Sequence, residues 1–322
     1  MRISSLAIAA ASAALLATSL SAPALADNEE QNLRERIIER LANRSDGDRR
    51  GRLRAEREPA PPADLVFDYA PGELHSIGFY HADNAAAPAP LVLFVHGGGW
   101  RQGNRINATG AHKSGHFTAQ NYHFASIDYG LIPETPVEEQ AHDVARAIKA
   151  LIDRADELKI DRERIVLMGH SAGAHLISLV STDPQYLAAQ GLTHSDILAA
   201  IPIDGAAYHV PEQMRGQRRL LRNMYEDAFG EDRERQRALS PTLHTAQPNV
   251  DNFLFLNVQR EDGIAQANQL SERLTAAGSH SRVELFEGEG LRGHAEINME
   301  MGNPDYAATP VVDAYLRDIF GS

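Results

Sequence analysis

The pattern Gly-x-Ser-x-Gly at residues 169–173 places a serine hydroxyl where it can act as a nucleophile. The apolar run before it, 164–168, predicts a buried strand, and the run after it, 174–180, predicts a helix packed on a core. A serine in a sharp turn between such a strand and helix exposes its Oγ at the tip of the turn. We therefore interpret Ser171 as a nucleophile rather than as a residue that only caps a helix.

Three consecutive glycines stand in the segment His-Gly-Gly-Gly-Trp at 96–100, directly after an apolar run at 91–95 that predicts another buried strand. Without side chains, their backbone N–H groups are open to an oxyanion, and the residue after a nucleophilic serine supplies the second donor of such a site. A flexible turn does not need three glycines in a row. We therefore expect an oxyanion hole made by Gly98, Gly99 and Ala172.

The serine needs a base, because its hydroxyl is a poor nucleophile at its free pKa. The chain has 14 histidines, so only their positions can distinguish them. A strand predicted at 253–258 should deliver the triad acid, and 281–286 is the last predicted strand. These motifs resemble those of α/β-hydrolases, and in that fold the chain order is nucleophile, acid, histidine, with the base after the last strand. His294 does so in a glycine-rich loop, whereas His280 precedes that strand, and we therefore predict His294 as the base.

Two adjacent carboxylates, Glu261 and Asp262, follow the strand that should deliver the acid. A carboxylate in this role fixes the histidine tautomer and stabilises the imidazolium that forms during the reaction. Their position in the sequence does not decide which of the two takes this role. The residue that does not take it is expected to be a solvated carboxylate in a loop.

These motifs resemble those of the α/β-hydrolase fold. Within that fold they are similar to the esterase branch of hormone-sensitive-lipase-like carboxylesterases, kynurenine formamidases and feruloyl or acetylxylan esterases. The resemblance runs from about Leu65 to the C-terminus. It is carried by HGGGW at 96–100, DYGLIPE at 128–134 and GHSAGAH at 169–175. It implies a serine hydrolase that works through an acyl-enzyme and needs no metal or other cofactor.

Two residues depart from the pattern of these esterases. Gly130 stands where they usually carry Arg, and His170 stands where the lipase-like branch usually carries Asp. A histidine before the serine is closer to the formamidase and feruloyl or acetylxylan esterase branch. Exported esterases of this kind use the Asp of an Arg-x-Asp turn, which matches residues 260–262. The resemblance therefore favours Asp262 over Glu261 as the triad acid.

Alternating strands and helices predict a mostly parallel sheet wrapped by helices, in agreement with the resemblance. The segments 65–69 and 75–80 suggest an opening antiparallel pair. We expect strands at 124–129 and 198–203, and a long amphipathic helix at 136–158. Both chemical motifs then lie at the carboxyl ends of strands, where ligands bind in such sheets.

The segment 205–248 differs from the rest because it is polar, rich in Arg and interrupted by proline. We expect it to form a small cap over the site. Candidates for its inner surface are Tyr208, His209, Met214, Met224, Tyr225 and Phe229.

The first 26 residues have the features of a secretory signal peptide. Arg2 gives a positive start, 6–20 is apolar, and 24–26 reads Ala-Leu-Ala, an A-x-A cleavage site. The apolar stretch is short for a membrane span. We therefore expect a mature chain that begins at Asp27 and is periplasmic or secreted.

The next segment, 27–62, is expected to be a charged helix and linker before a catalytic domain at 63–322. Apolar residues at helical spacing predict a short amphipathic helix at 31–41. The loop at 46–57 is similar to a degenerate EF-hand loop, but arginines replace oxygen ligands at its fifth and twelfth positions. We interpret this loop as a linker and not as a calcium site.

Composition narrows the range of partners. The chain has 322 residues and 43% hydrophobic residues, which suits one large domain with a sizeable core. A net charge of −13 argues against nucleic acid and anionic membranes as partners. The absence of cysteine excludes disulfides and a thiol nucleophile. Histidine and carboxylate residues lack metal-ligand spacing, so we expect no metal, and the sequence does not specify an oligomeric state.

Together these observations predict an exported serine carboxylesterase that hydrolyses small or aromatic acyl esters with the triad Ser171, Asp262 and His294. An amide or formamide hydrolase similar to arylformamidases is the alternative within enzymes. A catalytically inactive binding protein on the same scaffold is the alternative from another class.

Overall fold

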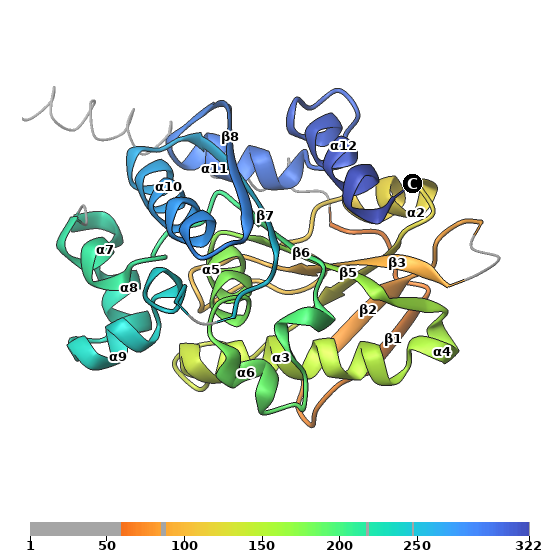
Figure 1. Cartoon of the computed structure of the whole chain (residues 1–322), viewed down its shortest axis with the longest axis horizontal. Coiled ribbons are helices and arrows are strands. Elements are labelled where there is room, and N and C mark those ends of the chain that lie inside the picture. Colours follow the sequence, from red (N-terminus) through yellow and green to blue (C-terminus); the bar gives the residue numbers. More distant parts are fainter. Residues whose placement is uncertain (1–58, 85–87, 217–218, 247, 322) are drawn as a thin grey trace, which may run out of the picture. The chain divides into compact units, whose positions relative to one another are not determined.

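An eight-stranded, mostly parallel sheet forms the centre of the computed structural model, which describes residues 59–84, 88–216, 219–246 and 248–321. The predicted signal peptide, amphipathic helix and calcium-like loop lie outside these described residues. Along the sheet the strand order is β1-β2-β4-β3-β5-β6-β7-β8 (Figure 1). The strands are β1 Leu65–Asp68, β2 Ser76–Tyr80, β3 Ala89–Val95, β4 His123–Ile127, β5 Ile160–His170, β6 Ala199–Ile203, β7 Asn252–Gln259 and β8 His280–Glu289.

Strands β3 to β8 run parallel, and β2 joins them antiparallel through β4. The predicted antiparallel pair at 65–69 and 75–80 is confirmed as β1 and β2. Parallel strands are buried on both faces, which explains why their sequences are continuous apolar runs. In β3, for example, Leu91 and Leu93 pack into one core, and Val92 and Phe94 pack into the other.

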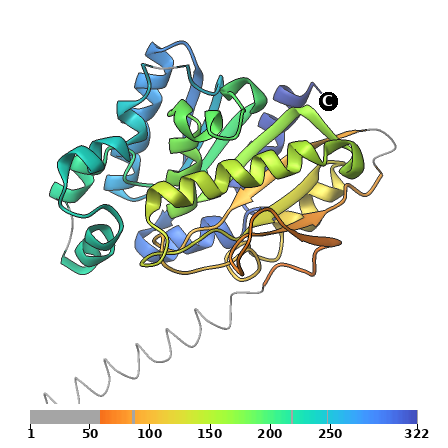
Figure 2. The same ribbon diagram turned by 90° about the horizontal axis from the view of Figure 1, so that it is seen from below.

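Helices cover both faces of the sheet, as expected from the alternating sequence pattern (Figures 1 and 2). One core contains residues of α3 Val137–Asp153, α4 Ala155–Leu158, α5 Ala172–Val180, α6 Pro184–Ala188 and α10 Glu261–Ala276. The other contains residues of α2 Lys113–Ala119, α11 Gly290–Met299 and α12 Ala308–Phe320. A short 3₁₀ turn, η1, spans His194–Asp196. The described chain therefore has the α/β-hydrolase architecture that the sequence predicts.

Two local predictions need correction. The helix expected at 136–158 is two helices, because Arg154 leaves the helical conformation with ψ of 10° between α3 and α4. The segment around His294, expected as a loop, is helix α11. Its residue Ile297 is fully buried against the sheet, and this packing supports helical structure despite the glycines at its start.

The segment 205–248 forms three helices and a 3₁₀ turn that we call the cap. In the ribbon views these helices, drawn in teal, gather beside α5 and α10 (Figures 1 and 2). An ion pair between Arg235 and Glu138 joins the cap to α3, and a second pair joins Asp227 to Arg101. The cap elements are α7 Val210–Gly216, α8 Arg219–Phe229, α9 Arg233–Ala238 and η2 Pro241–Leu243.

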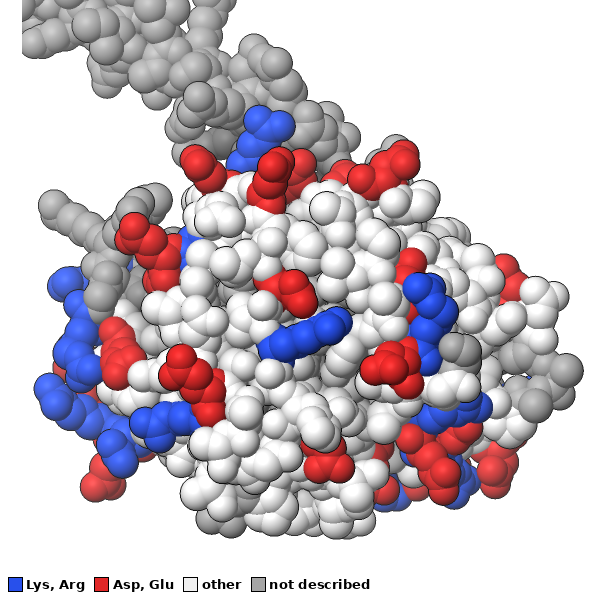
Figure 3. Space-filling view, turned by 45° about the horizontal axis from the view of Figure 1, so that its top comes forward, with Lys and Arg blue, Asp and Glu red and all other residues white. Residues whose placement is uncertain are grey.

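Charged side chains of both signs lie side by side on the face drawn in Figure 3. Much of that face is uncharged, and the acidic and basic groups are scattered rather than gathered into one field of a single sign. Among the described helices, none combines the length and the apolar character that crossing a membrane requires.

Candidate active site

Ser171 occupies the turn between β5 and α5, as the Gly-x-Ser-x-Gly pattern predicts. Its φ of 54° and ψ of −115° lie in a region that non-glycine residues rarely adopt. The turn is tight because α5 approaches β3 closely: a Cβ on Gly173 would lie 2.1 Å from the carbonyl oxygen of Val95. The strained conformation is held by these packed elements and presents the serine at the carboxyl end of the sheet.

His294 reaches the serine from α11. Its Nε2 lies 3.0 Å from Ser171 Oγ, which is hydrogen-bonding distance. The imidazole is mostly buried, with 17% of its side chain exposed. The structure thus brings together the predicted nucleophile and the predicted base, although they are 123 residues apart in the chain.

The second nitrogen of His294 contacts Asp204, which the sequence analysis did not select. Asp204 Oδ2 lies 2.5 Å from His294 Nδ1, and Oδ1 accepts a hydrogen bond of 3.2 Å from the backbone N–H of Val258. The carboxylate is fully buried. Burial raises the pKa of Asp204, but the hydrogen bond from His294 and the charge of Arg260 outweigh it and hold this pKa below its usual value. Asp204 is therefore ionised and placed to orient His294.

The prediction that Asp262 orients His294 is wrong. Asp262 lies in the first turn of α10 with 44% of its side chain exposed. Its Oδ2 contacts Gln213 Nε2 at 3.1 Å and Arg260 Nη2 at 3.6 Å. Glu261, the alternative, is exposed in the same turn, and Asp204 occupies the position at Nδ1 that was expected for one of them.

The register of the sheet explains this difference. Strands β5 and β6 are neighbours, and His170 pairs with Ile203, so the next residues, Ser171 and Asp204, leave the sheet at the same level. On β7 the corresponding level falls just after Leu256, which pairs with Ile203. By Asp262 the chain has already turned into α10. A single aspartate directly after the apolar run of β6 is the sequence signal that could have identified Asp204.

The glycine loop after β3 lies beside Ser171. A Cβ on Gly97 would come within 3.0 Å of Ser171 Cβ. Gly98 has φ of 135°, and a Cβ there would lie 1.8 Å from the carbonyl oxygen of Gln102, so only glycine permits this turn. Ala172 begins α5, and its N–H has no acceptor within the helix. Gly97 at the start of the glycine loop and the amide of Ala172 thus lie next to the serine.

His96 supports the glycine loop. Its Nδ1 donates to the carbonyl oxygen of Gly97 at 2.8 Å, and its ring stacks on Tyr129 at 4.3 Å between centroids. The Tyr129 hydroxyl donates to the His96 carbonyl oxygen. Complete burial lowers the pKa of His96 to about 4, so the ring is neutral at pH 7. A neutral, doubly anchored ring fixes the loop without adding charge to the site.

His170, the residue before the serine, supports His294. Its Nε2 donates to the backbone carbonyl oxygen of His294 at 2.9 Å, and the two rings are 4.5 Å apart. Burial, followed by the charge of His294, lowers the pKa of His170 well below its usual value. His170 is therefore a neutral donor that holds the backbone of the base.

The cap contributes apolar side chains next to the loop. A Cβ on Gly99 would lie 2.7 Å from the Sδ of Met224 on α8, so this methionine covers the loop directly. Tyr225 and Phe229 pack on Trp100, with ring centroids 5.8 Å and 4.8 Å away. Three of the six predicted inner-surface residues thus face the loop and its tryptophan.

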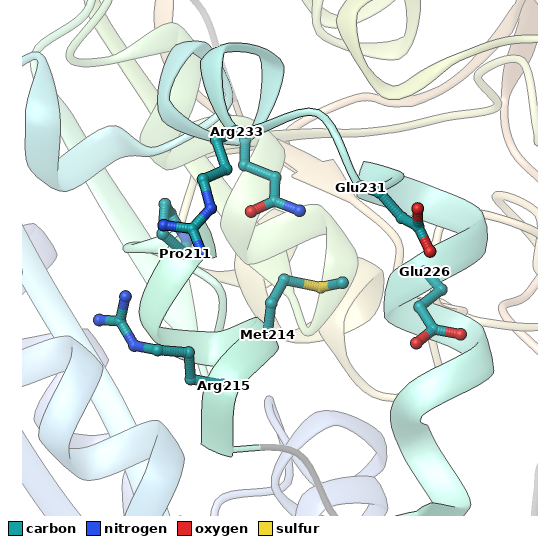
Figure 4. A pocket seen from close by; sticks show the side chains of 7 residues that line it. Pro211, Met214, Arg215, Glu226, Glu231 and Arg233 are labelled. Atoms are coloured by element: carbon teal, nitrogen blue, oxygen red, sulfur yellow. The ribbon is translucent and has the colours of Figure 1, made fainter.

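A separate pocket of about 230 Å³ lies between the three cap helices (Figure 4). Side chains of both charges line it, and its lining does not include Ser171, Asp204 or His294. Within the described part of the chain, no three His, Asp or Glu side chains gather closely enough to hold a metal ion. The lining residues are Pro211, Met214, Arg215, Glu226, Glu231, Arg233 and Gln236.

Comparison with known proteins agrees with this architecture. Residues 77–195 match the family model described as BD-FAE. The chain is similar to a probable isoprenylcysteine alpha-carbonyl methylesterase of Arabidopsis thaliana, with 25% identity over 75% of this chain and 53% of that protein. It is also similar to esterase LipC of Mycobacterium tuberculosis, with 31% identity over 66% of this chain and 54% of that protein. The chain thus spans about half the length of these two curated relatives.

A shorter match and two solved structures extend the comparison. Kynurenine formamidase of Drosophila melanogaster is 26% identical over 35% of this chain and 37% of that protein. Esterase B of Lactobacillus rhamnosis superposes with a TM-score of 0.66 at 17% identity, over 91% of this chain and 96% of that one. An esterase of Thermogutta terrifontis superposes with a TM-score of 0.63 at 21% identity, over 80% of this chain and 93% of that one. The chain has the α/β-hydrolase fold, and its resemblance to the esterase and formamidase branch is confirmed.

Proposed function

We propose that the protein is a serine carboxylesterase whose triad is Ser171, His294 and Asp204. The observation that carries this proposal is the continuous path from Ser171 Oγ through both nitrogens of His294 to Asp204, with distances of 3.0 Å and 2.5 Å. The glycine loop beside the serine adds the donors that ester hydrolysis requires.

The reaction follows from this geometry. Ser171 Oγ attacks the ester carbonyl carbon, and its proton moves to His294 Nε2. The carbonyl oxygen becomes an oxyanion that accepts hydrogen bonds from Ala172 and from Gly98 or Gly99. Protonated His294 then gives its proton to the leaving alcohol, which departs and leaves an acyl-serine. Water, activated by the same histidine, hydrolyses the acyl-enzyme and restores the serine. Throughout, Asp204 accepts the Nδ1–H and stabilises the imidazolium.

The substrate in this proposal is an ester with a small or aromatic, uncharged acyl group. Met224, which is partly buried and lies over Gly99, makes the cap side of the loop apolar, and Trp100, Tyr225 and Phe229 are buried in the core next to it. Apolar surface favours uncharged groups, because a charged group would lose its hydration there. The relatives that are named as esterases support the same reaction class.

A formamide hydrolase is the second candidate. The match to kynurenine formamidase and the histidine at position 170 favour it. Both reactions need the same nucleophile, base and oxyanion donors, so a substrate panel separates them. We would compare nitrophenyl esters, feruloyl esters, acetylated xylan and N-formylkynurenine. Faster turnover of N-formylkynurenine than of every ester would reverse the order of the two candidates.

A serine-directed fluorophosphonate probe tests the proposal that the protein is an enzyme at all. We expect one covalent adduct, located on Ser171 by peptide mass spectrometry, and none in Ser171→Ala. An unlabelled wild-type protein that also hydrolyses no ester would favour the binding-protein alternative.

We also propose that the protein is exported to the periplasm or the medium. The proposal rests on the positive start, apolar stretch and Ala-Leu-Ala site within residues 1–26. N-terminal sequencing of the secreted or periplasmic protein should find Asp27 first. Material that keeps Met1 would contradict cleavage.

A further inference from the structure

Arg260 lies against the aspartate and the histidine of the site, at the junction of β7 and α10. Its Nη1 is 2.7 Å from Asp204 Oδ2, 3.2 Å from the Asp204 carbonyl oxygen and 2.7 Å from His294 Nδ1. Only 13% of the side chain is exposed. A fixed cation is therefore enclosed beside the two groups that must share a proton charge during the reaction.

The contact between Arg260 and His294 restricts the tautomer of the histidine. A guanidinium only donates hydrogen bonds. When Asp204 Oδ2 accepts from both groups, His294 carries its hydrogen on Nδ1 and leaves Nε2 free to accept from Ser171. If Arg260 donated to Nδ1 instead, the hydrogen would sit on Nε2 and the base would be lost. The position of Asp204 between the two donors decides which arrangement forms.

Arg260 also anchors Asp204 itself. Asp204 has φ of 42°, a left-handed conformation that costs free energy for a non-glycine residue. Arg260 bonds both the carboxylate and the backbone carbonyl oxygen of this residue, so one side chain fixes both ends of the strained aspartate.

A second carboxylate holds Arg260 from the other side. Asp262 Oδ2 is 3.6 Å from Arg260 Nη2 and accepts a hydrogen bond from Gln213 on cap helix α7. Gln213 Nε2 is in turn 3.4 Å from the Tyr225 hydroxyl on α8. The arginine is thus tied to the cap through Asp262, the residue first expected to be the triad acid.

We propose that Arg260 is a positioning residue of the triad, which anchors Asp204 under His294, keeps a fixed positive charge beside the imidazole and is itself held by Asp262. The inference rests on the proposed serine hydrolase function. It goes beyond that function because it adds two charged residues, Arg260 and Asp262, to the three residues of the triad, with separate roles.

The charge of Arg260 has a consequence for pH dependence. A cation beside the imidazole opposes its protonation, so removing it favours the imidazolium, which cannot accept the serine proton. The acid limb of the kcat/KM profile should then move to higher pH. The charged or titratable groups that act on Arg260 are Asp204, Asp262 and Tyr225. Those near His294 or along its helix are the neutral His170, the buried Lys113 on α2, and Arg292 and Glu296 on α11.

The test is the pH profile of nitrophenyl ester hydrolysis from about pH 5 to pH 9 for a set of arginine variants. Arg260→Met removes charge and anchor together. We expect its acid limb to rise by roughly one pH unit and its kcat to fall about tenfold to a hundredfold, with little change in KM. Arg260→Lys keeps the charge, so its limb should stay in place while kcat falls partly. Arg260→Gln also removes the charge but keeps a polar side chain, so it should show the same raised limb.

Arg292→Met is the matched control, because it removes an exposed arginine from the same helix as His294. Its profile should not move. An Arg260→Met or Arg260→Gln limb that coincides with the wild type would overturn the inference, since lost packing alone lowers kcat without moving the limb. If Arg260→Met does not fold, Arg260→Gln and Arg260→Lys still give opposite outcomes. Failure of the proposed function is distinct: the wild-type protein then shows neither probe labelling nor esterase activity.

Discussion

Asp204 and His294 meet at the carboxyl end of the sheet with 2.5 Å between Oδ2 and Nδ1, although 90 residues separate them in the chain. The aspartate leaves β6, directly beside the strand that carries the serine, and the histidine arrives from α11 after the last strand. Three separate elements thus converge on one line of hydrogen bonds. Because Asp204 lies on this line and Asp262 does not, separate mutation of the two candidate acids distinguishes their roles.

Asp204→Asn should lower kcat by on the order of 10³ to 10⁴, because an amide at this position favours the wrong histidine tautomer. Asp262→Asn should cost less than about tenfold, since its carboxylate is partly solvated and acts only through Arg260. Steady-state kinetics on one nitrophenyl ester compares the two directly. A large loss of kcat in Asp262→Asn, with a nearly unchanged kcat in Asp204→Asn, would reverse our assignment of the triad acid.

The conformation of Ser171 gives a prediction about stability. Its φ of 54° is strained for serine and for alanine but not for glycine. The free energy of unfolding of Ser171→Gly should therefore be about 1 kcal/mol higher than that of Ser171→Ala. Ser171→Gly should accordingly unfold at a higher denaturant concentration. Both variants should lose at least about 10⁴ in kcat, because the oxyanion donors alone retain only residual catalysis. Equal unfolding curves for the two variants would argue against strain at the turn.

Met224 should influence the choice of acyl group, because its sulfur lies directly over Gly99. Met224→Ala opens space there, and we expect kcat/KM for octanoyl relative to acetyl nitrophenyl esters to rise roughly tenfold. Met214→Ala is the control, because Met214 lines the separate pocket in the cap. The ratio should be unchanged in the control, and an unchanged ratio in Met224→Ala would remove this residue from the acyl site.

Lys113 gives a pH dependence of stability. Burial lowers its pKa to about 7, while in the unfolded chain it titrates near 10.5. Between these values the unfolded chain binds more protons, so this lysine makes the free energy of unfolding rise with pH. The free energy of unfolding of the wild type, relative to that of Lys113→Met, should therefore increase by a few kcal/mol from pH 7 to pH 9. Urea unfolding of both proteins at pH 7 and pH 9 measures this difference. A difference that does not change with pH would mean that Lys113 stays charged in the folded protein.

Much of the fold follows from local sequence pattern. Apolar runs placed the strands, and glycine motifs placed the serine turn and the oxyanion loop, because each depends on neighbouring residues. The acid could not be found this way. Whether Asp204 or Asp262 faces His294 depends on the register of β5 against β6 and on the start of α10, which are tertiary properties. Arg260 was missed for the same reason, since its partners lie 56 and 34 residues away.

The two attachments of the cap differ in their sensitivity to salt. Arg101 and Asp227 are each about half exposed, with 50% of each side chain accessible, so dissolved ions screen this pair strongly. Arg235 bonds Glu138 through two nitrogens and also donates to the Ala228 carbonyl oxygen, which makes that end the more firmly held. Rising ionic strength therefore loosens the edge of the cap beside the oxyanion loop before it loosens the edge on α3.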